Sequence, residues 1–83
     1  MHMTRPASVR AYAEVLRLVR RLPPEARSYY SRFARENFAT YNDEVDQSTI
    51  STLLARAYKH SCWVLSKYGV DKAAADKLKQ ICK

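Results

Sequence analysis

The chain has 83 residues, which is enough for one domain with a small core and too few for two cores. Apolar residues make up 47% and charged residues 28%, and this composition excludes a disordered chain. A single glycine argues against a β-sandwich or a glycine-rich phosphate loop. The formal net charge is +7, of which +5 falls in residues 1–40, so we expect an acidic partner. No apolar run approaches the ~18 residues that a membrane span needs.

The first predicted helix covers residues 8–22, where apolar residues recur at helical spacing over a wide arc. The arc consists of Val9, Tyr12, Val15, Leu16, Leu18, Val19 and Leu22. The opposite side carries Arg10, Arg17 and Arg21, and Glu14 lies within reach of the first two. Residues 23–24 are both proline and end this helix, because proline is disfavoured inside a helix but suits the first turn of the next one.

Two further long helices are predicted, over residues 24–41 and 47–68. A polar, acidic connection separates them, and Asp46 or Ser48 can cap the second of the two. Gly69 is the expected residue after the end of that helix. Asp71 can then cap a short helix over residues 71–81. The sequence therefore predicts a single all-α domain over residues 1–83, an antiparallel three-helix bundle with a short C-terminal helical tail.

Two aromatic residues lie away from the predicted core stripes. Phe38 is about 100° from the centre of the apolar stripe of its helix, beside Arg35. Trp63 lies on the polar side of its helix, among the cations at 56, 59 and 67. Either ring is covered by a neighbouring helix, or it is an anchor for a partner on a basic surface.

The sequence contains no pattern typical of a catalytic or metal site. His60 and Cys62 are two residues apart and so point to different faces of their helix, without a third group to orient them. Cys62 and Cys82 could form at most one bridge, and we expect reduced thiols. No nucleotide-binding, hydrolase or zinc-protease motif occurs. We therefore predict that the chain is not an enzyme and holds no metal.

Residues 9–68 resemble the LYR-motif (Complex 1 LYR-like) family of small mitochondrial proteins. The family pattern is a Leu-Tyr-Arg tripeptide in the first helix, then a basic run, then Arg-x-x-Phe in the second helix. Residues 11–13, Ala-Tyr-Ala, occupy the tripeptide, so only Tyr12 of it is kept. Arg17, Arg20 and Arg21 form the basic run, and residues 35 and 38 supply the Arg and the Phe. Ala39 stands where the family commonly has another Arg.

The resemblance implies a non-catalytic adaptor in the mitochondrial matrix or on the matrix side of the inner membrane. Members of the family bind the acidic mitochondrial acyl carrier protein, and its phosphopantetheine-linked acyl chain enters the apolar interior of the helical bundle. They serve a larger client: a respiratory complex, the iron–sulfur machinery or the mitochondrial ribosome. The chain would need no cofactor of its own, since the acyl-phosphopantetheine belongs to the partner.

Two binding surfaces are predicted on this basis. The carrier-binding residues are Tyr12, Arg10, Arg17, Arg20, Arg21, Arg35 and Phe38. A second partner surface would consist of Arg56, Lys59, Trp63 and Lys67. The alternative function is a small basic helical protein that binds nucleic acid, although the cationic face of the third long helix has no Asn or Gln to read base edges.

Overall fold

The computed structural model describes residues 7–39 and 46–82. Its elements in chain order are α1 (Ala7–Val19), α2 (Pro24–Ala39), α3 (Gln47–Lys67), a 3-10 turn η1 (Lys72–Ala75) and α4 (Asp76–Ile81). The prediction of an all-α fold is confirmed, since every regular element in these two ranges is helical. Residues 40–41, predicted as the end of the second helix, and the acidic connection at 42–45 lie outside the described residues. Over the described ranges, none of the helices is long and apolar enough to cross a membrane.

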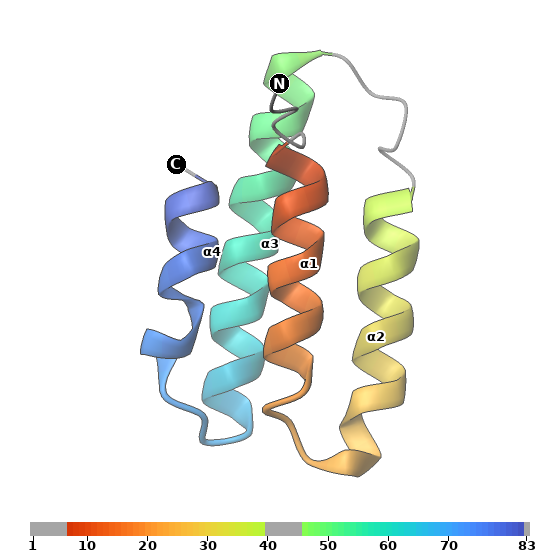
Figure 1. Ribbon diagram of the computed structural model, residues 1–83, viewed down its shortest axis with the longest axis vertical. Coiled ribbons are helices and arrows are strands. Elements are labelled where there is room, and N and C mark those ends of the chain that lie inside the picture. The colour runs from red at the N-terminus through yellow and green to blue at the C-terminus, as the bar shows by residue number, and fades with distance from the viewer. Residues whose placement is uncertain (1–6, 40–45, 83) are drawn as a thin grey trace, which may run out of the picture.

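Successive helices run in opposite directions, and α1 is the central element of the arrangement (Figure 1). In this view α2 lies on one side of α1, and α3 and α4 lie on the other. Helix α1 packs against all three of the other helices, whereas α2 packs chiefly against α1. The side of α2 that faces α3 is therefore loosely packed.

The end of α1 is tighter than the sequence predicts. The α-helix ends at Val19, and the N–H groups of residues 20–22 then donate to carbonyls three residues earlier. Pro23 disfavours the α conformation for Leu22, so the last turn narrows to 3-10 geometry. Arg27 Nε donates to the carbonyl oxygen of Leu22 at 2.9 Å, which ties the start of α2 to this turn.

The predicted caps of α3 are confirmed. The carboxylate of Asp46 accepts the N–H two residues further on, at 3.0 Å. Beyond the helix, Gly69 has φ +72°, a left-handed conformation that only glycine adopts at no steric cost. The N–H groups of Gly69 and Val70 donate to Ser66 (3.2 Å) and Leu65 (2.8 Å), which is a Schellman motif. The motif reverses the chain so that the C-terminal segment returns along the bundle.

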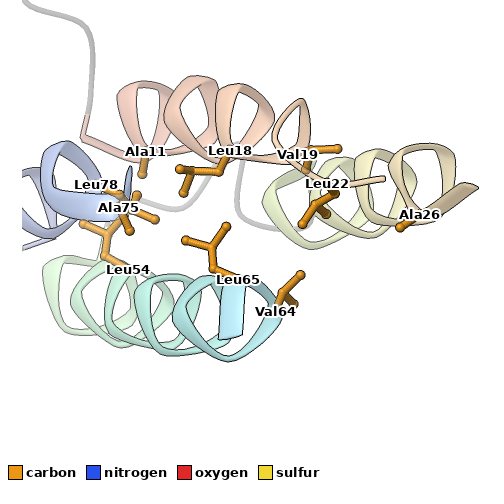
Figure 2. Packing of buried hydrophobic residues seen from close by; sticks show 10 residues of the cluster. All are labelled: Ala11, Leu18, Val19, Leu22, Ala26, Leu54, Val64, Leu65, Ala75 and Leu78. Carbon is orange, nitrogen blue, oxygen red and sulfur yellow. The ribbon is translucent and has the colours of Figure 1, made fainter. Parts of the chain in front are cut away.

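The C-terminal segment is part of the core. The predicted continuous helix over residues 71–81 is divided into η1, capped by the carboxylate of Asp71, and α4. Ala75 and Leu78 are 1% and 0% exposed, and Figure 2 shows them beside Ala11 of α1 and Leu54 of α3. This segment therefore closes one side of α1 and α3, a larger role than that of an appended tail.

The main hydrophobic cluster draws unequally on the helices. Its buried members are Ala11, Leu18, Val19, Leu22, Ala26, Leu54, Val64, Leu65, Ala75 and Leu78. Most of them come from α1, α3 and the C-terminal segment, and Leu65 lies between α1 and α3 (Figure 2). The buried residues of α2 are two alanines, Ala26 and Ala34. Because such small side chains fill little volume, the contact between α2 and α3 is left with unfilled space.

Candidate functional site

A cavity of about 270 Å³ lies between α1, α2 and α3. Helix α1 contributes aliphatic side chains to its wall, among them Val15, Leu18 and Val19. Helix α2 contributes the aromatic rings of Phe33 and Phe38. Ligand pockets in proteins are typically lined in this way, by apolar and aromatic side chains with few polar groups.

The cavity exists because small residues occupy core-facing positions of α2 and α3. Ala34 of α2 is 4% exposed but does not belong to the main hydrophobic cluster. Ala57 and Ser61 of α3 line the same space, and Ser61 is only 8% exposed. A leucine at any of these three positions would occupy part of the cavity. Small residues on otherwise apolar helical faces indicate unfilled space between helices. We did not use this feature of the sequence to predict the site.

The polar groups at the cavity wall are few. Asn37 donates from Nδ2 to the backbone carbonyl of Phe33 at 2.8 Å, so its amide is bound within α2. His60 is partly buried, and this burial lowers the pKa of its imidazole, which favours the neutral ring near pH 7. Arg56 lines the cavity, although the residue as a whole is exposed to solvent. The wall therefore suits an aliphatic chain, with polar groups placed singly around it.

Of the two alternatives left open for Phe38, the structure favours cover by a neighbouring helix. It is partly buried, packs against the main cluster and lines the cavity. Its ring lies 5.3 Å from that of Tyr12 on α1, centroid to centroid, with an interplanar angle of 34°. The sequence gives the angular position of Phe38 on α2 only, and this position does not reveal that Tyr12 of α1 packs against the Phe38 ring. Arg35, one turn before Phe38, is exposed.

The basic residues of α1 do not form one patch with Tyr12. Arg10 lines a shallow depression against α4, together with Lys77, which is the opposite flank of α1 from the Tyr12 ring contact. Arg17 is 54% exposed and pairs with Glu14, Nη2 to Oε1 at 2.7 Å. Its charge is therefore partly compensated on α1 itself, as the spacing predicted.

Arg20 and Arg21 lie in the turn between α1 and α2, away from Tyr12 in the middle of α1. Both are exposed and fall in the turn after α1, whereas the sequence placed them inside the helix. Eight helical residues correspond to about 12 Å along the axis. The structure thus brings Tyr12 against Phe38, leaves Arg35 exposed one turn earlier on α2, and sets Arg20 and Arg21 apart.

The predicted second surface is on the exposed side of α3. Trp63 is 59% exposed, and Lys67 Nζ lies 5.4 Å from its ring centroid, in the geometry of a cation–π contact. Arg56 and Lys59 are exposed on the same helix. Tyr29 of α2, 64% exposed, borders the same groove as Trp63, so this surface extends from α3 onto α2.

Both cysteines are partly buried free thiols. Cys62 accepts a hydrogen bond that, with burial and nearby charges, raises the pKa of the Tyr58 hydroxyl. Burial raises the pKa of the Cys82 thiol, which favours its protonated, unreactive form. These residues belong to the contact of α3 with the C-terminal segment, away from the cavity.

Comparison with known proteins decides the family. The sequence model described as Complex 1 protein (LYR family) matches residues 8–61, which include α1, α2 and most of α3. The chain belongs to the LYR family. The match covers most of the cavity wall and leaves out the C-terminal segment that closes the other side of α1.

Two curated LYR relatives are similar over most of their length. An LYR motif-containing protein of Arabidopsis thaliana is 55% identical over 76 residues, which cover 89% of this chain and 93% of the relative. An LYR motif-containing protein of Physcomitrium patens is 58% identical over 57 residues, 69% of this chain and 86% of the relative. No solved structure matches the chain at a significant level. LYR proteins are generally mitochondrial adaptors without catalytic activity.

Proposed function

We propose that this LYR protein is a non-catalytic mitochondrial adaptor that binds an acylated acyl carrier protein. Helices α1, α2 and α3 form the bundle that receives the acyl chain, and the chain lies in the cavity between them. The adaptor then acts as a subunit or assembly factor of a larger matrix-side complex. The observation that carries the proposal is the apolar cavity of about 270 Å³ in a chain of this family.

The energetics favour an aliphatic occupant. Each methylene moved from water into an apolar site contributes ~0.8 kcal/mol, so a chain of medium length supplies a large share of the binding free energy. The same burial stabilises the folded protein, because the unfolded chain has no cavity to offer. An acyl chain therefore acts as a ligand and as a missing part of the core.

The carrier is proposed to dock at the contact of Tyr12 with Phe38, with Arg35 one turn earlier on α2. Phe38 contacts Tyr12 on one side and lines the cavity on the other, so it joins the surface to the interior. Arg35 is the exposed cation nearest to it along α2 and can meet an acidic side chain of the carrier. The net charge of +7 would speed the encounter, with Arg17, Arg20 and Arg21 contributing to the field.

A second partner, the client, is proposed to bind the surface formed by Arg56, Lys59, Trp63 and Lys67. An exposed tryptophan flanked by cations is a typical interface anchor. Helix α3 contains no acidic residue, so this face also suits an acidic partner. Trp63 and Lys67 border the external groove and do not line the cavity, so a client held there would leave the cavity open to the acyl chain of the carrier.

Thermal unfolding of the purified chain tests the proposal. The melting temperature is measured alone, with unacylated carrier and with acylated carrier. A ligand at one hundred times its dissociation constant adds about 2.7 kcal/mol of stability, which raises Tm by roughly 10–20 °C in a domain of this size. Acylated carrier should give this rise, and unacylated carrier a much smaller one. Equal melting temperatures in all three samples would refute acyl insertion.

Random duplex DNA serves as the control for the alternative function. If the chain binds DNA with a steep dependence on salt, and no acyl group changes this binding, the basic surface serves nucleic acid. If the acylated carrier raises Tm and random DNA does not, the adaptor function is supported.

A further inference from the structure

Three aromatic side chains separate the cavity from a groove on the outside of the protein. Tyr30 and Phe33 of α2 and His60 of α3 line the cavity, and the same three residues line the external groove. On the outer side the groove is bordered by Tyr29 and Trp63, which are 64% and 59% exposed. At this point a single layer of side chains forms the partition between the cavity and the groove.

The partition is held together by ring contacts across α2 and α3. The rings of Phe33 and His60 lie 4.6 Å apart, and those of Tyr30 and His60 lie 6.3 Å apart. Tyr30 also meets Tyr68 edge to face, with the ring centroids 6.1 Å apart. These contacts fix the rings in place across the gap that the alanines of α2 leave open.

The partition lies along α2 from the docking residues, toward the start of that helix. Phe33 is five residues from Phe38 and Tyr30 is eight, which correspond to about 7.5 Å and about 12 Å along the helix axis. A chain that enters past Phe38 and runs along α2 therefore reaches Phe33 and then Tyr30. Its terminal methyl group would face this wall, with solvent directly behind it.

We infer that Phe33, supported by Tyr30 and His60, is the end wall of the acyl site and sets the longest chain that the protein accepts. This inference rests on the proposed function. Each methylene that fits within the cavity tightens binding about fourfold. The first methylene beyond the wall gains nothing, because it must displace a packed ring or protrude into the groove. Affinity should thus rise with chain length up to a limit and then level off or fall.

The test compares carriers loaded with saturated chains in two-carbon steps from octanoyl to hexadecanoyl. Calorimetric titration of the full chain gives the length at which affinity is greatest. In Phe33→Ala the optimum should move to chains longer by about two to four carbons, since the removed ring frees space at the wall. The matched control is Arg32→Ala, which removes a large exposed side chain next to Phe33 that lines neither the cavity nor the groove. It should leave the optimum unchanged.

Substitutions of Phe33 in both directions keep the test independent of stability. Phe33→Trp should move the optimum to shorter chains, a change that a general loss of stability cannot produce. If Phe33→Ala is unfolded by circular dichroism, Phe33→Leu replaces it, with a smaller shift in the same direction expected. The same optimum in wild type and in the folded variants would overturn the end wall while leaving acyl binding intact. If wild type responds to no chain length, both the inference and the proposed function are refuted.

Discussion

Filling the cavity from within should stabilise the free protein and weaken its response to the carrier. Ala57 of α3 lines the cavity and is not packed against the main hydrophobic cluster. Ala57→Leu adds three carbon atoms to the wall without loss of helix propensity, because leucine is nearly as good a helix former as alanine. At ~0.8 kcal/mol for each buried carbon, the gain is about 2 kcal/mol.

The volume of the cavity gives the same magnitude. Enclosed cavity space costs ~24 cal/mol per Å³, so filling roughly 90 Å³ of the 270 Å³ recovers at most about 2 kcal/mol. For a domain of this size the corresponding rise in Tm is roughly 8–16 °C. Thermal melts followed by circular dichroism measure it directly. Ala55→Leu, an exposed position two residues earlier on α3, is the matched control and should change stability by about 0.5 kcal/mol or less.

The carrier provides the second half of this prediction. The added side chain takes space that the acyl chain would use, so the Tm rise caused by acylated carrier should be smaller in Ala57→Leu than in wild type. A lower Tm for Ala57→Leu alone would refute the reasoning. It would mean that the wall is already close-packed, since inserting carbons into a full core costs about 1–3 kcal/mol.

Three further predictions concern the C-terminal segment, the end wall and the docking site. Leu78→Ala should lower the free energy of unfolding by about 3 kcal/mol, whereas the exposed control Lys79→Ala should change it little. Urea unfolding measures both changes. A change near zero for Leu78→Ala would mean that the C-terminal segment does not contribute to the core. Because burial lowers the pKa of His60 in the folded chain, the unfolded chain takes up this proton first as pH falls below about 6.5. Stability should therefore decrease from pH ~6.5 downward and be independent of this group above it. In the His60→Phe variant, the decrease in stability at low pH should be smaller, as melts at several pH values would show. A pH profile of stability identical to that of wild type would contradict the assignment of this decrease to His60. Arg35→Glu should slow carrier association severalfold at low salt, while Arg10→Glu, with the same change of net charge on the α4 flank, should have a smaller effect in stopped-flow measurements. Equal effects would place the docking site elsewhere.

The ends of the elements were predictable because they depend on local chemistry. Asp46, Gly69 and Asp71 act through their own backbone geometry or through hydrogen bonds to near neighbours in the chain. The residue type and its position in the sequence are therefore enough to predict these helix ends. The end of α1 was predicted three residues too late. The change from α-helical to 3-10 hydrogen bonds before Pro23 begins three residues earlier than the residue that the proline directly restricts.

The cavity and the role of Phe38 were not predictable in the same way. A wide apolar arc on α1 is compatible with a closed core and with an open one, because both need the same residues on that helix. What distinguishes them is the size of the side chains opposite, such as Ala34 and Ala57, and which positions lie opposite depends on the arrangement of three helices. Phe38 was judged from its own helix, whereas its surroundings are decided by Tyr12 on another.

The small buried residues of α2 also bear on how the cell would treat the protein. A domain of this size has little stability to spare, and unfilled interior volume leaves the free chain nearer to the threshold at which quality-control proteases remove it. An occupant of the cavity restores that margin by mass action. With the proposed function, the amount of adaptor that survives would follow the supply of acylated carrier. The steady-state level of the protein would then report on fatty-acid synthesis without any dedicated sensor, through the space left by Ala34 and its neighbours.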